Sequence, residues 1–158
     1  SELSSVLYAP IETVRYRTVE TVNVREVKPD EFDTWARLGA EGWSDELPEL
    51  FDFVAAMGAV TARRAGSKAW FAEIDSEPIA VAAMSISGNT AHMDGAATIP
   101  RARGRGAQNA LLAVRLAYAR ERGCDIAVVG TACGSASQRN AERNGFRIAY
   151  TRTKWTRA

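Results

Sequence analysis

Apolar residues recur along this chain with two periods, and each period predicts one kind of secondary structure. Spacings of three and four residues indicate amphipathic helices, whereas alternation or a short continuous apolar run indicates a strand. Pro29 and Pro48 open stretches with helical spacing, and Gly42, Gly123 and Gly145 follow such stretches, as is typical of helix ends. By residue number, the expected elements are an extended or loose segment 1–20, a strand 22–27, helices 29–42 and 48–63, strands 69–74, 79–86 and 90–99, a helix 107–122, a strand 125–129, a helix 137–144 and a strand 146–155.

Two of these elements carry a more specific expectation. The strand at 79–86 is apolar at nearly every position, so both of its faces should be covered. The helix at 48–63 has an apolar stripe that is expected to face the core. The stripe consists of Leu50, Phe51, Val54 and Met57.

The order of elements predicts the fold class and the domain organisation. A chain of 158 residues has the size of one compact domain. We expect residues 22–158 to form a single domain, and residues 1–21 to be an N-terminal extension or an extra strand. Helices come first, a three-strand meander follows, and strand–helix–strand units end the chain, which places it in the α/β (α+β) class.

Composition excludes several classes of protein. No apolar run approaches the roughly 18 residues of a membrane span, and the first residues lack the basic start and apolar stretch of a signal peptide. Two cysteines, Cys124 and Cys133, and one histidine, His92, are too few for a disulfide scaffold, a zinc finger or a two-histidine metal site. The sequence therefore predicts a cytoplasmic protein without a metal and without a membrane partner.

Charge is balanced overall but unevenly distributed. The formal net charge is +1, yet residues 26–54 hold nine acidic side chains against two basic ones. Residues 101–122 hold six arginines against one glutamate. One interpretation is two solvated faces that aid solubility. The other is a protein that holds an anion with its second half and attracts a cation with its first.

The segment from Ile99 to Leu112 is the most informative part of the sequence. A strand ends at Pro100, a loop with Gly104 and Gly106 follows, and a long amphipathic helix begins at once. Glycines let a ligand approach the backbone, and the first amides of a helix carry a partial positive charge. Three arginines lie at alternate positions beside them, which favours a pyrophosphate site over a plain strand-to-helix turn. Walker and dinucleotide-binding loops do not fit, because Gly-Lys-Ser/Thr and the third glycine are missing.

Two motifs here resemble those of a known family. P-x-x-R-G-R-G-x-x-x-x-L-L, from Pro100 to Leu112, resembles the acetyl-CoA-binding motif of the GNAT-type N-acetyltransferases. S-Q-R-N-A-E-R-N-G-F, from Ser137 to Phe146, resembles the second motif of the ribosomal-protein type within that family. The resemblance implies a mixed, splayed sheet of about six to seven strands with helices on both faces.

The resemblance also implies a donor substrate and the residues that bind it. The donor is acetyl-CoA, whose pantetheine arm would run along Thr98 and Ile99, with the Ile99 amide polarising the thioester carbonyl. Asn140 belongs to the same implied cofactor site. The pyrophosphate would lie on the loop and the start of the helix, at Arg103, Gly104, Arg105, Gly106, Ala107, Gln108 and Asn109. Gln108 departs from the small residue usual at its position; it would bind phosphate or line the groove.

Direct transfer to an amine needs a base and a proton donor for the sulfur. His92 falls near the family's usual base, and imidazole, with a reference pKa of about 6.5, suits this role. Asp94 and then Glu73 are the alternatives. Two-residue alternation would place His92, Asp94, Ala96 and Thr98 on one strand face. The family's usual tyrosine acid is replaced by Ala141, and the resemblance implies Ser137 as the donor, unless it only caps its helix.

The resemblance implies an N-acetyltransferase acting on a primary amine of a small molecule or peptide. A cationic amine would be attracted by side chains between the first two helices, namely Trp43, Asp45, Glu46, Glu49 and Asp52. A catalytically silent acyl-CoA-binding sensor is one alternative. A nucleic-acid-binding domain using Arg101–Arg105 is another, disfavoured by the near-zero net charge, so no nucleic-acid partner is expected. A homodimer with paired last strands is compatible with the sequence.

Overall fold

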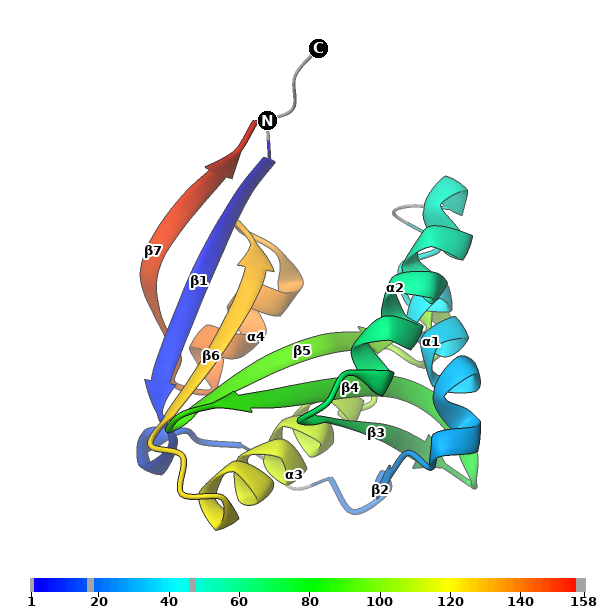
Figure 1. The fold of residues 1–158 in the computed structure, drawn as a ribbon, viewed down its shortest axis with the longest axis horizontal. Coiled ribbons are helices and arrows are strands. Elements are labelled where there is room, and N and C mark those ends of the chain that lie inside the picture. Colours follow the sequence, from blue (N-terminus) through cyan, green and yellow to red (C-terminus); the bar gives the residue numbers. More distant parts are fainter. Residues whose placement is uncertain (1, 17–18, 46–47, 156–158) are drawn as a thin grey trace.

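A single seven-stranded sheet organises the computed structural model, which describes residues 2–16, 19–45 and 48–155 (Figure 1). The strand order is β2-β3-β4-β5-β6-β1-β7. In chain order the strands and helices are β1 (Glu2–Pro10), β2 (Asn23–Glu26), α1 (Phe32–Glu41), α2 (Phe51–Arg63), β3 (Ser67–Ile74), β4 (Glu77–Ser87), β5 (Thr90–Thr98), α3 (Ala107–Glu121), β6 (Ile126–Ala132), α4 (Ala136–Arg143) and β7 (Arg147–Lys154).

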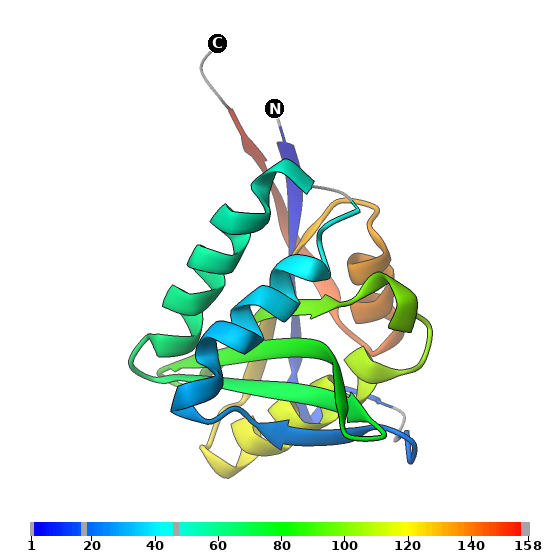
Figure 2. The same cartoon turned by 90° about the vertical axis from the view of Figure 1, so that its right-hand side faces the viewer.

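The expected mixed sheet with helices on both faces is confirmed. Strands β2 to β5 form an antiparallel meander, and β5 pairs with β6 in parallel. Helices α1 and α2 cover one face, while α3 and α4 cover the other (Figure 2). The continuously apolar strand β4 is buried from Ile79 to Met84, as its sequence predicts. No helix in the described part of the chain is long and apolar enough to cross a membrane.

The chain's first strand lies within the sheet. The sequence left residues 1–20 as extended or loose, but Glu2–Pro10 form β1, which is hydrogen-bonded to β6 on one side and to β7 on the other. Leu7 and Ala9 are buried in the core. Burial of alternate apolar side chains fixes the register of this strand.

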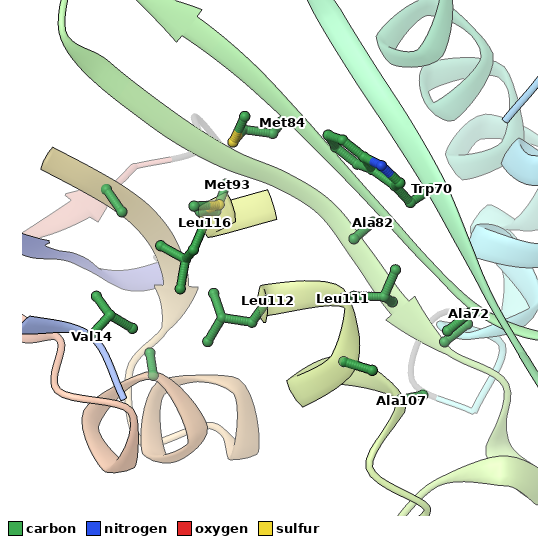
Figure 3. Close-up of a cluster of buried hydrophobic side chains, with 14 of the residues drawn as sticks. Val14, Trp70, Ala72, Ala82, Met84, Met93, Ala107, Leu111, Leu112 and Leu116 are labelled. Carbon is green, nitrogen blue, oxygen red and sulfur yellow. The ribbon is translucent and has the colours of Figure 1, made fainter. Parts of the chain in front are cut away.

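Helix α3 packs along the meander, on the face of the sheet that carries the larger hydrophobic cluster. Leu111, Leu112 and Leu116 are buried against side chains of β3, β4 and β5, including Met84 and Met93 (Figure 3). Burying a leucine side chain contributes about 1.5–3 kcal/mol. These three leucines therefore anchor the helix whose first turn follows the glycine–arginine loop, Pro100–Gly106.

The predicted inward stripe of α2 is wrong for two of its four residues, because only Phe51 and Val54 are half-buried. Leu50 and Met57 are 39% and 50% exposed. The reason lies in the contact between α1 and α2, which small residues make very close. A Cβ on Gly58 would lie only 3.2 Å from Ala36 of α1. The fully buried residue of α2 is the small Ala62, and Phe53, Met57 and Val60 are exposed.

Strand β5 contains a bulge that changes which side chains share a face. Asp94 pairs with Ala83 and Ala97 pairs with Val81, so two residues of β5 oppose one residue of β4. Gly95 in the bulge has φ +57°, and a Cβ there would lie 2.9 Å from the Trp35 ring of α1. A bulge of this kind shifts the alternation by one residue. The prediction that His92, Asp94 and Thr98 share one face is therefore wrong.

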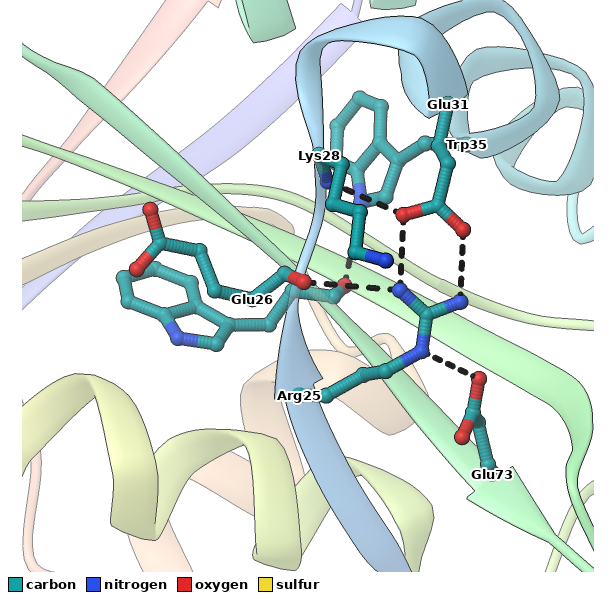
Figure 4. A network of polar contacts seen from close by, with 7 residues as sticks. Arg25, Glu26, Lys28, Glu31, Trp35 and Glu73 are labelled. Carbon is teal, nitrogen blue, oxygen red and sulfur yellow. Dashed lines mark hydrogen bonds and ion pairs between the residues drawn. The ribbon is translucent and has the colours of Figure 1, made fainter.

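A polar network ties β2 and β3 to the start of α1 (Figure 4). Both Nη groups of Arg25 donate to the Glu31 carboxylate at 2.7 and 2.8 Å, and its Nε donates to Glu73 at 2.7 Å. The Lys28 amide donates to the same Glu31 carboxylate at 3.0 Å. These bonds, led by those from Arg25, lower the pKa of Glu31 to about 2. Bidentate arginine–carboxylate pairs are among the stronger polar contacts.

The network should make stability depend on pH. The lowered pKa of Glu31 means that its stabilisation is complete above the ordinary value of 4.5 and is lost as the pH falls toward 2. Glu31→Gln should lower the free energy of unfolding at pH 7 and leave it nearly unchanged at pH 2. Urea denaturation across this range measures both values. Asp33→Asn, which removes an exposed single contact with Arg63, is the control; an equal loss in both variants would contradict the assignment.

Candidate active site

A cleft of about 580 Å³ opens where β5 and β6 separate. Parallel pairing of the two strands covers only Thr90–Met93 against Ile126–Val129, and beyond these residues the strands diverge, as the resemblance implied. Backbone groups on the two edges are thus left without a strand partner. The cleft is lined by residues of β5, the glycine–arginine loop, α3, β6 and α4, together with Gly42 and Trp43 after α1.

The predicted cofactor residues lie together along this cleft. Those that line it are Thr98, Arg103, Gly104, Arg105, Gly106, Ala107, Gln108, Asn109 and Asn140. Gly104 and Gly106 have φ values of +78° and +83°, a region that favours glycine. Gly106 is the cap residue of α3, and no side chain accepts a hydrogen bond from the first amides of this helix. These amides, which carry the partial positive charge of the helix start, remain available at the cleft. Such a helix start favours a bound anion.

Two amide side chains hold the loop in place. Gln108 Nε2 donates to the Ala97 carbonyl oxygen at 3.1 Å and to Thr98 Oγ1 at 3.0 Å. Asn144 Nδ2, at the end of α4, donates to Asn109 Oδ1 at 3.3 Å. Of the two roles that the sequence left open for Gln108, its position favours lining the groove, since its amide nitrogen is already bonded to β5.

Two of the three loop arginines are bound to acidic side chains rather than facing an anion. Arg101 donates to Glu41 and Glu77, each at 2.8 Å, and these contacts raise its pKa. Arg103 donates to Asp45 at 3.0 Å and to the Gly42 carbonyl at 2.9 Å. Part of the acidic first half of the chain is therefore paired with part of the basic second half. Among the described residues Arg105 has no carboxylate partner, so its charge is available to the cleft.

The predicted role of the Ile99 amide is wrong. Its N–H donates to the Ile79 carbonyl at 3.1 Å, so it faces β4 and cannot reach a thioester. Consecutive amides of a strand point to opposite edges. The Thr98 amide therefore faces the side where β6 has separated. Gly42 leaves space there, since a Cβ at this position would lie 3.1 Å from the Thr98 nitrogen.

None of the three candidate bases, His92, Asp94 and Glu73, is among the residues that line the cleft. Asp94 shares a face with Ala83, its partner in β4, on the α1 and α2 side, and alternation places His92 on the same face. Asp94 Oδ2 accepts from Ser85 Oγ at 3.2 Å and from Arg64 at 3.3 Å. Glu73, on β3, accepts a hydrogen bond from Arg25 of β2.

The second motif brings its polar residues to the same cleft. Ser137 and Asn140 line it from α4, and Ala141 lies beside them. Ser135, not Ser137, caps this helix, because its Oγ accepts from the Gln138 amide at 3.1 Å. The hydroxyl of Ser137 is thus not the cap.

On the opposite wall, Trp43 lines the cleft, while Asp45 is bound to Arg103. Glu49 and Asp52 are exposed near the start of α2. Glu46, which the sequence grouped with them, lies outside the described residues. The expected acidic cluster is therefore only partly available to an amine.

Sequence reasoning missed residues that the fold brings from far apart. A second hollow of about 450 Å³ adjoins the first at Asn109 and Asn140, and Arg15, Tyr16 and Arg143 line it. Arg15 belongs to the segment treated as a separate extension, so no local signal connects it with Arg143. Arg115 of α3, also unpredicted, lines the main cleft from a buried position.

Comparison with solved structures supports the fold. A protein of unknown function from Staphylococcus epidermidis is 10% identical with a TM-score of 0.72, over 95% of this chain and 59% of that one. A GCN5-related N-acetyltransferase from Kribbella flavida is 17% identical with a TM-score of 0.64, over 94% and 55%. The chain thus spans somewhat more than half the length of these two proteins.

A third structure is similar along nearly all of its own length. AAC(6')-Iy in complex with the bisubstrate analogue CoA-S-monomethyl-acetylneamine is 21% identical with a TM-score of 0.67, over 87% of this chain and 97% of that one. No curated protein matches the chain significantly. The sequence model of the acetyltransferase (GNAT) family matches residues 25–146, which include β2 to α4 and the whole of the main cleft's loop. With this match over most of its length, the chain belongs to the GNAT acetyltransferase family.

Proposed function

We propose that this protein transfers an acetyl group from acetyl-CoA directly to a primary amine of a small molecule or peptide. The observation that carries the proposal is the uncapped start of α3 behind a loop with two positive-φ glycines, at the mouth of a cleft between diverging strands. Family membership and the CoA complexes of the similar aminoglycoside N-acetyltransferase AAC(6')-Iy support it.

The loop would hold the pyrophosphate of the donor. The amides of Ala107 and Gln108 begin α3, whereas those of Asn109 and Ala110 already donate to the Gly106 carbonyl. Arg105 would add positive charge beside the pyrophosphate, whereas Arg101 and Arg103 are already paired with carboxylates of the chain. The second hollow, lined by Arg15 and Arg143, suits the one phosphate of CoA that is not part of the pyrophosphate.

The thioester would lie beside the free edge of β5. Its carbonyl oxygen gains negative charge as the amine attacks, and the Thr98 amide faces the gap where that oxygen would be. The nitrogen–carbon bond forms, the carbon–sulfur bond breaks, the amine loses a proton and the sulfur gains one.

We assign the proton from the amine to His92, with Asp94 as the next candidate. Asp94 is already bound to Arg64 and Ser85, which leaves the imidazole better placed to accept a proton. Ser137 is the proposed proton donor for the sulfur, because it lines the cleft and does not cap α4.

One observation favours a second candidate function. Ala141 stands where the family resemblance leads one to expect a tyrosine acid, and a methyl group cannot donate a proton. A domain that binds acyl-CoA without transferring the acyl group would have the same loop and cleft. Tight acetyl-CoA binding without thiol release across aminoglycosides, polyamines and peptides would establish this second function.

Gly104→Val should weaken CoA binding by at least about tenfold, the equivalent of roughly 1.4 kcal/mol. A valine side chain at this position would occupy open space along the cleft, and the positive φ of Gly104 would be strained, which would displace the loop amides that hold the phosphate. Gly123→Val is the matched control, with φ +73° and open space but a position after α3, away from the cleft. Calorimetry should detect unchanged CoA affinity in the control, and equal affinities in both variants would remove the phosphate assignment.

His92→Ala should lower kcat/KM by about a hundredfold or more at neutral pH, the usual contribution of a positioned base. In the proposed reaction the imidazole takes the proton that the amine loses, so the variant should be slow in transfer while it still binds CoA. Thiol release with the best amine from the screen measures the rates, and CoA affinity checks that the variant is folded. A kcat/KM in the variant equal to that of the wild type would exclude His92 as the base.

A further inference from the structure

Helix α3 places a buried cation in the wall of the main cleft. Arg115 is only 4% exposed, and it is the one arginine among the buried residues of the described part of the chain. Arginine is rarely buried without a carboxylate beside it, because removing its charge from water is costly. None of the ion pairs between described residues includes Arg115.

Its hydrogen bonds leave part of the guanidinium without a partner. Nε donates to the Leu111 carbonyl at 3.2 Å, one turn earlier in α3. Nη1 donates at 3.3 Å to the carbonyl of Ala83, the residue of β4 next to the bulge. A guanidinium has five N–H donors. Within the described residues, Nη2 makes no hydrogen bond, so one edge of the fork has no protein partner.

The group remains charged under ordinary conditions. Burial lowers the pKa of Arg115 to about 10, and the charge of Asp94 acts in the opposite direction. Asp94 itself is bound to Arg64 and Ser85, so it does not neutralise the guanidinium by direct contact. The cleft therefore has a persistent positive charge away from its phosphate-binding loop.

The position of Arg115 in the cleft relates this charge to the acyl end of the donor. It lines the cleft with Met93 and Val129, the last residues of β5 and β6 that still pair with each other. The proposed thioester site at Thr98 lies further along β5, beyond the bulge. An acyl chain that extends from the thioester toward the point where the strands join would meet this wall.

We propose that Arg115 forms a subsite for a carboxylate at the end of the acyl group, so that the protein binds dicarboxylic acyl-CoA thioesters such as succinyl-CoA in preference to neutral ones of equal length. The inference rests on the proposed function, since it assumes that the cleft binds an acyl-CoA. A carboxylate would accept from the unused edge of the guanidinium and would supply the negative charge that no described residue places in contact with it.

Calorimetry with CoA thioesters and no amine tests the subsite. Because no acceptor is present, a carboxylate on the acceptor cannot produce the measured difference. CoA, butyryl-CoA, succinyl-CoA and the methyl ester of succinyl-CoA are titrated into the wild type, Arg115→Met and Arg115→Lys. In the wild type, succinyl-CoA should bind about tenfold or more tightly than butyryl-CoA and the ester, the usual gain from a charge-assisted bond. Arg115→Met should abolish this difference, Arg115→Lys should retain part of it, and CoA should bind all three proteins equally.

Equal wild-type affinity for succinyl-CoA, its methyl ester and butyryl-CoA would overturn the subsite, and this comparison needs no variant. A preference that survives in Arg115→Met would overturn it as well, and Arg115 would then only complete the hydrogen bonding of the bulged strand. If CoA itself does not bind the wild type, the proposed function fails. If CoA binds and the acyl groups are not distinguished, only the subsite fails.

Discussion

The separation of β5 from β6 is the constraint on which the site depends. Only four residue pairs join the two strands, and beyond them each edge has backbone groups without a strand partner. In most sheets such an edge is a liability. Here the first turn of α3, the glycine–arginine loop and α4 gather around the opening, and Gln108 fixes the loop to β5 through Ala97 and Thr98. The gap is therefore supported by side chains, and an extended ligand can occupy the place of a strand.

Electrostatics around the gap is more selective than the sequence indicates. Arg101 and Arg103 lie in the loop but hold the end of α1 and the residues after it against β5. Two of their three carboxylate partners, Glu41 and Asp45, come from the acidic segment 26–54, and Asp45 is one of the residues expected to attract a cationic amine. The charges that still face the cleft are fewer and lie at distinct depths, with Arg105 at the loop and Arg115 near the junction of the strands. This arrangement favours one extended anionic ligand over a general affinity for polyanions.

Local patterns predicted the elements well, because helix spacing, strand alternation and glycine stops are properties of neighbouring residues. The loop from Pro100 to Gly106 was also recognisable, since its glycines, arginines and helix start are contiguous. What failed depends on contacts between distant segments. The bulge at Gly95 reverses the face of Thr98, and it follows from the packing of Gly95 on Trp35 of another element. The close contact of Gly58 with α1 leaves Met57 and Val60 of α2 exposed, and no periodicity contains that information.

Strand β1 interlocks the two ends of the described chain. It pairs with β6 through Ser4–Pro10 and with β7 through Glu2–Tyr8, so β7 is joined to the sheet only across β1. Contacts between segments so distant in sequence form late and slowly, because a long loop must close before they are made. The last strand thus acquires its place only after the first has docked, which makes this edge the least cooperative part of the sheet and the natural place for reversible opening.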